Sequence, residues 1–315
     1  MKPTGWFHVA WSAQIPRGSV LPMRYFGHDL VAFRTSDGEL SVLDAHCRHQ
    51  GAHLGFGGRV VDDCIACPYH GWHWDPSGVN ARIPYEDRPS RARLRVWDVV
   101  EKHGLVFMWH DPAGGPPRDG WELPDLFADY PELIEDEADY HPCYPNLIVD
   151  RPGERFHPQL VQENLGDATH FTYVHASENP RIESFEADGA YWRVNMSYTS
   201  ERSKRVGLRL YNISAGIGAH FTLFQGRRDT HRVIITVTPV DDSTSDMRLS
   251  YFFQRAPESR DAFTPAQQAF ADAIDTSFEQ DAVIWRHQVF VQNPVFAPQD
   301  RAAYSALRVW CQQFY

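Results

Sequence analysis

The amino-acid sequence predicts an α+β protein of two domains, in which an antiparallel β domain precedes a domain whose antiparallel sheet wraps around a long helix. The chain has 315 residues, which suits two domains of roughly 100–200 residues each. Its first third consists of short apolar runs between turn residues, whereas the remainder ends in one long helical pattern. We expect the domains to span residues 1–112 and 113–315.

Short strands dominate the first domain. Asp37-Gly38 separates two apolar runs, which is a hairpin signal, and further runs follow before His110. Several such strands favour a small antiparallel β domain. The apolar runs lie at 30–33, 40–43, 94–97 and 105–109.

The second domain begins after a segment rich in proline and glycine, 111–120, which breaks every regular pattern and is the expected linker. A helix is expected over 162–175, and strands are expected after it. Their apolar runs lie at 191–198, 206–213, 221–224, 233–237 and 247–253. A sheet in this order can wrap a cavity against a following helix.

That following helix is the last element we expect. Thr264 suits its N-cap, and Pro265 suits its first position. Apolar residues then recur on one helical face, which should be directed inward. They are Phe270, Ile274, Phe278 and Trp285.

Composition excludes several classes of protein. Hydrophobic residues make up 43% of the chain, which is enough to bury a core, and the net charge of -11 would repel nucleic acid and anionic membranes. No apolar run has the length of a membrane span, and residues 1–16 lack the apolar core of a signal peptide. Five cysteines, an odd number, fit a reducing compartment, so we expect a cytoplasmic protein.

Two short loops carry the pattern of a metal centre. Cys47 and His49 lie in the first loop, and Cys67 and His70 follow 17 residues later. One cysteine and one histidine per loop suit a [2Fe–2S] cluster in which one iron binds both thiolates and the other both imidazoles. A structural zinc ion accepts the same four ligands, but zinc motifs usually pair cysteine with cysteine along the chain. The spacing therefore favours the cluster over zinc.

The sequence around these ligands resembles the cluster-binding loops of Rieske proteins. The first loop reads His-Cys-Arg-His-Gln-Gly-Ala-His-Leu-Gly, and the second reads Cys-Pro-Tyr-His-Gly-Trp-His-Trp. This resemblance implies that the first domain is a Rieske domain with a [2Fe–2S] cluster. A Rieske domain alone would be an electron carrier, so the second domain must decide the function.

A second metal centre is expected in that domain. Polar side chains lie at Asn164, Asp167, His170 and His175. The two histidines are five residues apart, which is about 140° around an ideal helix, so both can bind one metal only if the helix distorts or ends between them. Two histidines and one carboxylate form the facial triad of non-haem iron oxygenases.

The long helix offers the carboxylate. Asp281 falls on the apolar face, whereas Asp272, Asp275 and Glu279 point elsewhere. A carboxylate on a buried apolar face is costly unless it is paired or binds a metal. The alternative to ligation is a buried salt bridge to Arg286 or another cation.

This second region resembles the Rieske non-haem iron oxygenases. The resemblance implies that His170, His175 and Asp281 bind a mononuclear Fe(II), and it makes Asp167 a candidate catalytic residue. Asn164 is a further candidate because its polar side chain lies close to these residues in the sequence. Oxygenases of this family form head-to-tail trimers in which an aspartate links the cluster of one chain to the iron of its neighbour. Here that link would join His70 to Asp167.

Among these oxygenases, the chain resembles the oxygenase component of 3-ketosteroid 9α-hydroxylase almost from end to end. The similar segments are 5–7, 80–85, 280–288 and 308–315. This resemblance implies a helix-grip (START-like) catalytic domain and hydroxylation of an unactivated C–H bond in an apolar polycyclic, steroid-like substrate with O2. The alternative is an O- or N-demethylase acting on another hydrophobic small molecule.

Electrons for such a reaction come from NAD(P)H. The chain has no Gly-x-Gly-x-x-Gly followed by a Rossmann pattern, so a separate ferredoxin reductase is implied. Aromatic residues are frequent around the expected iron; most should pack in the core, and the rest should line an apolar pocket. They are Phe171, Tyr173, Phe221, Phe224, Phe253 and Trp285.

Overall fold

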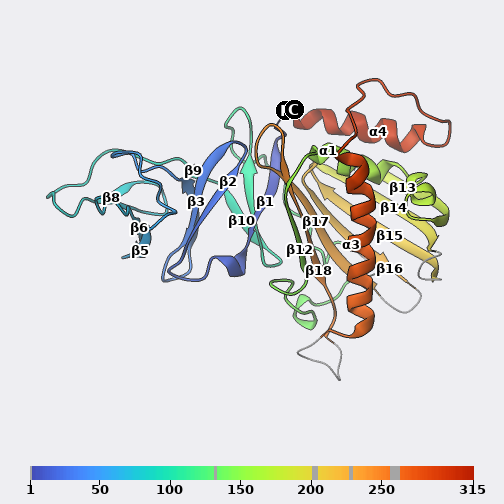
Figure 1. The fold of residues 1–315 in the computed structure, drawn as a ribbon, viewed down its shortest axis with the longest axis horizontal. Coiled ribbons are helices and arrows are strands. Elements are labelled where there is room, and N and C mark those ends of the chain that lie inside the picture. The colour runs from blue at the N-terminus through green and yellow to red at the C-terminus, as the bar shows by residue number, and fades with distance from the viewer. Residues whose placement is uncertain (1, 131–132, 201–204, 227–229, 256–262) are drawn as a thin grey trace.

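The computed structural model describes residues 2–130, 133–200, 205–226, 230–255 and 263–315. Figure 1 shows two regions along the long axis, with small β-sheets at one end and a large sheet covered by a long helix at the other. All strand pairs within these sheets are antiparallel. The predicted α+β class is confirmed.

The N-terminal region contains three sheets. The first has the order β1 (Gly5–Trp11), β11 (Leu105–His110), β10 (Val99–Lys102). The second has the order β2 (Val20–Tyr25), β3 (His28–Arg34), β4 (Leu40–Asp44), β9 (Val96–Trp97). The third, at the far end, has the order β5 (Arg59–Val61), β6 (Cys64–Ala66), β7 (His73–Trp74), β8 (Asn80–Arg82).

The hairpin predicted at Asp37-Gly38 joins β3 to β4. Arg34 pairs with Leu40 across it, and Gly38 has a φ of 108°, a conformation that favours glycine. The predicted linker, 111–120, contains no helix or strand.

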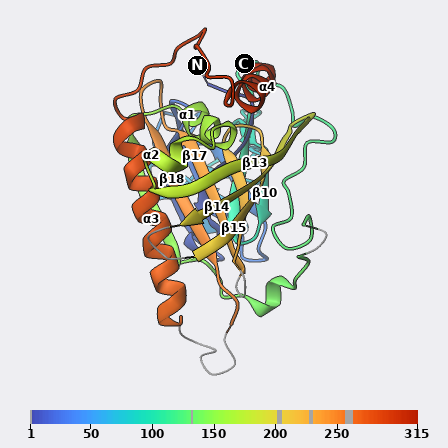
Figure 2. The ribbon, with the colours of Figure 1, turned by 90° about the vertical axis from the view of Figure 1, so that its right-hand side faces the viewer.

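The C-terminal region is built on one seven-stranded sheet. Its order is β12 (Ile148–Glu154), β18 (Ser245–Phe252), β17 (Thr230–Pro239), β16 (Ala219–Gln225), β15 (Arg205–Ala215), β14 (Tyr191–Ser200), β13 (Ser177–Asp188). Helix α3 (Pro265–Trp285) lies against one face of this sheet (Figures 1 and 2). Helix α4 (Arg301–Cys311) follows it and packs against β13.

Helix α3 begins as predicted. Thr264 accepts a hydrogen bond from the backbone N–H of Gln267 at 3.2 Å, and the Gln267 side chain accepts one from the backbone N–H of Thr264 at 2.8 Å. This reciprocal capping box satisfies two donors at the helix start. Within the described residues, no helix is long and apolar enough to cross a membrane.

The helix-like stretch expected over 162–175 is interrupted, and its last helix ends at Tyr173, between the two histidines, as binding of both to one metal requires. Helix α1 (Pro158–Glu163) passes into a 3-10 turn (Asn164–Gly166), the backbone of Asp167 is extended at φ -123° and ψ 100°, and α2 (His170–Tyr173) follows. Gly166 lies where α4 approaches, since an added Cβ would be 3.2 Å from the Tyr304 Cα. These changes of backbone direction allow the side chains of His170 and His175 to approach one another.

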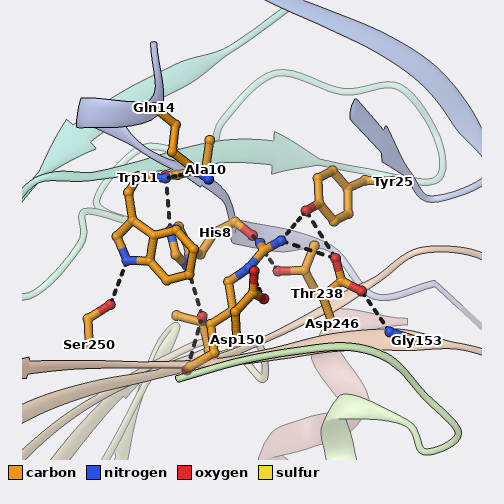
Figure 3. Close-up of polar contacts among 12 residues, drawn as sticks. His8, Ala10, Trp11, Gln14, Tyr25, Asp150, Gly153, Thr238, Asp246 and Ser250 are labelled. Atoms are coloured by element: carbon orange, nitrogen blue, oxygen red, sulfur yellow. Dashed lines mark hydrogen bonds and ion pairs between the residues drawn. The ribbon is translucent and has the colours of Figure 1, made fainter. Parts of the chain in front are cut away.

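A buried ion-pair network joins the two regions (Figure 3). The guanidinium of Arg248, on β18, contacts Asp150 at 3.0 Å, Asp246 at 3.1 Å and the Tyr25 hydroxyl at 2.6 Å. Burial would lower the pKa of Arg248, but these partners outweigh it and keep the guanidinium charged. Arg248 also donates to the carbonyl of His8, on β1, at 3.3 Å.

Apolar packing crosses the same junction. Trp11 and Phe107 come from the N-terminal region, yet they belong to the core cluster of the large sheet. The rings of Phe107 and Phe221 stack with centroids 6.3 Å apart, and the indole N–H of Trp11 donates to Ser250 at 2.9 Å. The two regions therefore share one of the hydrophobic clusters of the protein, and two further clusters lie within the N-terminal region.

We predict that Arg248→Met lowers the free energy of unfolding by about 3 kcal/mol, because it leaves the acids of the junction without their buried cation. Urea denaturation followed by circular dichroism and by cluster absorbance measures this. Arg193→Met is the control, since its ion pairs with Glu186 and Asp188 are exposed and contribute little. Two well-separated transitions in the parent protein would contradict the shared core.

Candidate metal centres

The two predicted cluster loops have the same backbone geometry. In the first, the N–H of Gly51 donates to the Cys47 carbonyl at 2.9 Å; in the second, the N–H of Gly71 donates to the Cys67 carbonyl at 3.0 Å. Both glycines have positive φ, 76° and 69°, which a side chain would oppose. In each loop the cysteine N–H also donates a hydrogen bond, to the carbonyl of residue 52 in the first loop and of residue 72 in the second. The two loops thus present their cysteine and histidine side chains from equivalent backbone positions.

The four predicted cluster residues lie together between these loops. Cys47 and Cys67 are buried and in no disulfide, and burial, with the neighbouring Cys67 thiol, raises the pKa of the Cys47 thiol. The rings of His49 and His70 lie 4.7 Å apart between centroids. The Nδ1 atom of His49 is buried without a hydrogen-bond partner in the described part of the chain. Two close thiols and an orphaned imidazole nitrogen fit a [2Fe–2S] cluster.

The second predicted ligand set also converges. One potential ligand atom from each of His170, His175 and Asp281 lies within 4.8 Å of the others. The first two come from α2 and the turn after it, and the third comes from the buried face of α3. The Nε2 atom of His175 lies 3.3 Å from a carboxylate oxygen of Asp281. Two imidazoles and one carboxylate on one side of a point are the donor set of a facial triad.

Hydrogen bonds orient both rings toward that point. The Nδ1–H of His170 donates to the main-chain carbonyl of Asp167 at 2.6 Å, and Nδ1 of His175 contacts the amide oxygen of Gln280 at 3.2 Å. Nε2 of each ring is then the nitrogen that is available to a metal. Sequence reasoning missed Gln280, although its position next to Asp281 is a signal that could have found it.

The predicted alternative for Asp281, a salt bridge to Arg286, is wrong. Arg286 instead contacts Glu154 at 2.6 Å and Glu279 at 2.8 Å. The side chain of Asp281 is only 9% exposed, so its charge needs compensation from the histidines and a cation.

Asp167 and Asn164 border this centre in different ways. The carboxylate of Asp167 accepts the backbone N–H of His170 at 3.2 Å but lies 3.7 Å from the His170 ring nitrogen, so the expected ring-to-carboxylate bond is replaced by the ring-to-carbonyl bond. Burial would raise the pKa of Asp167, but the contacts with His170 outweigh it and hold that pKa below its usual value. Asn164 lines the cavity next to the histidines.

A cavity of about 490 Å³ opens between the sheet and α3 and includes all three residues of the triad in its wall. Of the six aromatic residues singled out in the sequence, Phe171, Phe224 and Trp285 line it. Phe221 and Phe253 are fully buried in the core instead, and Tyr173 is 84% exposed. Sequence reasoning also missed a polar part of the wall, which comes from Asn212, His220 and Thr222.

Comparison with known proteins agrees with both centres. Residues 5–101 match the Rieske [2Fe-2S] domain, and residues 108–315 match the 3-ketosteroid 9α-hydroxylase C-terminal domain. The predicted boundary at residue 112 stays a prediction, because the matches leave residues 102–107 between them.

Curated relatives match along the whole chain. The oxygenase component of 3-ketosteroid-9-alpha-monooxygenase from Rhodococcus rhodochrous is 29% identical, covering 99% of this chain and 80% of the relative. Cholesterol 7-desaturase nvd from Drosophila melanogaster is 28% identical, covering 99% and 75%.

Solved structures show the same fold. Pseudomonas putida CBB5 NdmA with caffeine superimposes with a TM-score of 0.74 at 19% identity, over 98% of this chain and 89% of that one. Dicamba monooxygenase bound to dicamba gives 0.69 at 18% identity, over 98% and 96%.

The fold, the cluster loops and these matches define a Rieske non-haem iron monooxygenase with a [2Fe–2S] cluster and a mononuclear iron. The C-terminal match covers more than half of this chain. The chain therefore belongs to the family of the 3-ketosteroid 9α-hydroxylase oxygenase component. An oxygenase component uses O2, a hydrophobic substrate and electrons from a separate reductase.

We predict that Asp281→Ala removes the mononuclear iron and leaves the cluster spectrum intact, because it changes only the triad. The iron content should fall from three to two per chain, with two acid-labile sulfides in both proteins. Asp275→Ala is the matched control on the same helix, since Asp275 pairs with Arg151 at 2.6 Å and lies outside the triad. Full iron content in Asp281→Ala would reject the assignment of this carboxylate.

We also predict that Cys47→Ser abolishes the red-brown cluster absorption and destabilises the N-terminal region, because binding of a metal centre contributes to folding. Cys64→Ser provides the comparison, since Cys64 is buried but lies outside both loops. Absorption and sulfide analysis distinguish the two. Cys47→Ser protein with a parent-like cluster spectrum would show that Cys47 is no ligand.

Proposed function

We propose that this protein hydroxylates an unactivated C–H bond of an apolar polycyclic, steroid-like substrate. The observation that carries the proposal is the cavity, whose volume of about 490 Å³ suits a molecule of that size and whose wall includes the triad. The printed names of the curated relatives, a 3-ketosteroid monooxygenase and a cholesterol desaturase, support a polycyclic substrate.

Each part of the cavity has a task in this reaction. Apolar side chains hold the substrate carbon near the triad and exclude water; they include Leu165, Phe171, Leu210, Phe224, Ile274 and Phe278. A mononuclear iron held by His170, His175 and Asp281 would supply the oxygen chemistry. The Asp167 carbonyl and the Gln280 amide keep the two imidazoles in the orientation that ligation requires.

We further propose that the working enzyme is a head-to-tail trimer. In one chain, the cluster loops lie beside β5, β6 and β8, at the opposite end of the long axis from α3 (Figure 1). This separation within one chain favours electron transfer from the cluster to the mononuclear centre of a neighbouring chain. His70 and Asp167 are both partly exposed, as contact between subunits would require.

Asp167 suits this link because its carboxylate lies 3.7 Å from the nearest ring nitrogen of His170, beyond a short hydrogen bond, so it can accept a further one. We propose that it accepts a hydrogen bond from His70 of the partner subunit. The electron donor would be an NAD(P)H-dependent ferredoxin reductase. All five cysteines are buried and unpaired, which supports a reducing compartment such as the cytoplasm.

We expect turnover of steroids in a panel of polycyclic compounds, measured with a surrogate reductase and product identification. A single hydroxyl inserted into a C–H bond would support the proposal. Loss of a methyl group as formaldehyde from O- or N-methylated compounds, with no steroid product, would support the demethylase alternative and reject hydroxylation.

We predict that Asp167→Asn keeps both metal centres but slows reoxidation of the reduced cluster, in a single turnover with substrate and O2, by roughly 10- to 100-fold. Asp300→Asn is the nearby control, because the Asp300 carboxylate accepts a hydrogen bond from Thr169 at 2.7 Å and has no part in the proposed link. Parent-like reoxidation, or full activity of a monomer, would reject the link between subunits.

A further inference from the structure

The sheet wall of the cavity changes from apolar to polar along two adjacent strands. Across β15 and β16, Leu210 pairs with Phe224, then Asn212 pairs with Thr222, and then Ser214 pairs with His220. Since alternate residues of a strand share a face, these pairs form one row on the cavity side of the sheet. The row ends in polar side chains, and a few polar groups in a mostly apolar pocket commonly fix the orientation of a ligand.

His220 is the most distinctive member of this row. It lines the cavity, yet only 2% of its surface is exposed. Its Nδ1 lies 3.1 Å from the Ser214 hydroxyl, whereas its Nε2 is buried with no hydrogen-bond partner among the described residues. A buried polar atom without a partner is rare in native proteins and calls for an explanation.

Two other buried histidines, His8 and His103, have partners on both ring nitrogens. In His8, Nδ1 is hydrogen-bonded to the Thr236 hydroxyl and Nε2 to the Ala10 carbonyl. In His103, Nδ1 is hydrogen-bonded to the Glu137 carboxylate, and Nε2 accepts from the backbone N–H of Leu126. Nδ1 of His49, in a cluster loop where a ligand is expected, is another buried ring nitrogen without a hydrogen-bond partner among the described residues. An orphaned nitrogen in the cavity wall therefore points to a ligand of the cavity.

The neighbours of His220 determine which kind of ligand group it binds. The Ser214 hydroxyl donates to the Asn212 amide oxygen at 2.9 Å, and the Asn212 amide nitrogen donates to Thr222 at 2.8 Å. Ser214 has then used its proton, so its oxygen accepts from the Nδ1–H of His220. Burial lowers the pKa of His220 to about 3, which keeps the ring neutral and leaves a lone pair on Nε2.

We propose that His220 recognises a hydroxyl group of the substrate by accepting its proton in a hydrogen bond at Nε2, with Ser214 and Asn212 fixing the tautomer. This inference rests on the proposed function and narrows its substrate to a hydroxyl-bearing polycyclic compound. A ketone at the same position has no proton to donate and would leave Nε2 unsatisfied. His220 is thus a specificity-determining residue on the sheet side of the cavity, whereas the metal ligands come from α2, its following turn and α3.

Three androstanes of nearly identical shape test the proposal by equilibrium binding to the reduced holoenzyme without O2. They are androstane-3,17-dione, 3β-hydroxyandrostan-17-one and 17β-hydroxyandrostan-3-one. We expect the protein to bind one of the two alcohols about tenfold more tightly than the dione, which corresponds to one hydrogen bond at a buried site.

Two substitutions of His220 separate recognition from structure. His220→Leu should reduce that tenfold preference to less than twofold while the affinity for the dione stays within twofold, because the dione never used Nε2. His220→Gln should retain part of the preference, since its amide oxygen can accept the same proton. A structural disturbance would weaken all three compounds together, and iron content and the cluster spectrum should match the parent in both variants.

Ser214→Ala tests the tautomer. Without the Ser214 oxygen, the imidazole can place its proton on Nε2 and donate to a ketone, so the dione should gain affinity relative to the preferred alcohol. Equal affinity of the parent protein for all three compounds, or an unchanged preference in His220→Leu, would overturn the role of His220 and leave the proposed function intact. Failure of all three to bind would overturn the steroid-like substrate class and this inference with it.

Discussion

The burial of one carboxylate, Asp281, is the constraint on which the catalytic region depends. Taking an ionised carboxyl into an apolar wall costs several kcal/mol unless opposite charge and hydrogen-bond donors meet it, on the order of what a whole domain has in net stability. The chain meets it with His175 at 3.3 Å and with His170 close by. Both imidazoles can converge only because the backbone leaves the helix at Asp167 and turns again after α2.

That constraint also explains the other acids of α3. Asp275 and Glu279 lie on the outer side of the helix, where Arg151 contacts both of them. The acids of this helix therefore have two roles. Asp275 and Glu279 attach the helix to β12 through Arg151, whereas Asp281, about half a turn away around the helix axis, is directed into the cavity. The periodicity of 3.6 residues per turn was enough to distinguish them in the sequence.

Hydrophobic periodicity did not predict two strands of the large sheet. Strand β13 is exposed along most of its length and has no alternation of apolar residues, so it was not predicted. Strand β12 contains proline and glycine, which usually argue against a strand. The cluster loops were predictable because the spacing of four ligands is local. The triad joins residues far apart in the sequence, so it was assembled from the chemistry of its donor set and the helical face of Asp281, and the family resemblance then implied the same ligands. The Gln280 contact and the polar row ending at His220 depend on tertiary register, which no local pattern reveals.

The shared core has a consequence for how such proteins diversify. Strand β1 faces β17 on the other side of the junction, and Thr238 donates to the His8 carbonyl at 2.6 Å while Arg248 reaches Tyr25. A recombination event at the proline-rich linker would bring together halves whose contact surfaces had been selected in different parents. Exchange of the N-terminal region of this chain for that of a relative would therefore require a partner whose surface matches at this junction, whereas a change inside the cavity leaves the junction untouched.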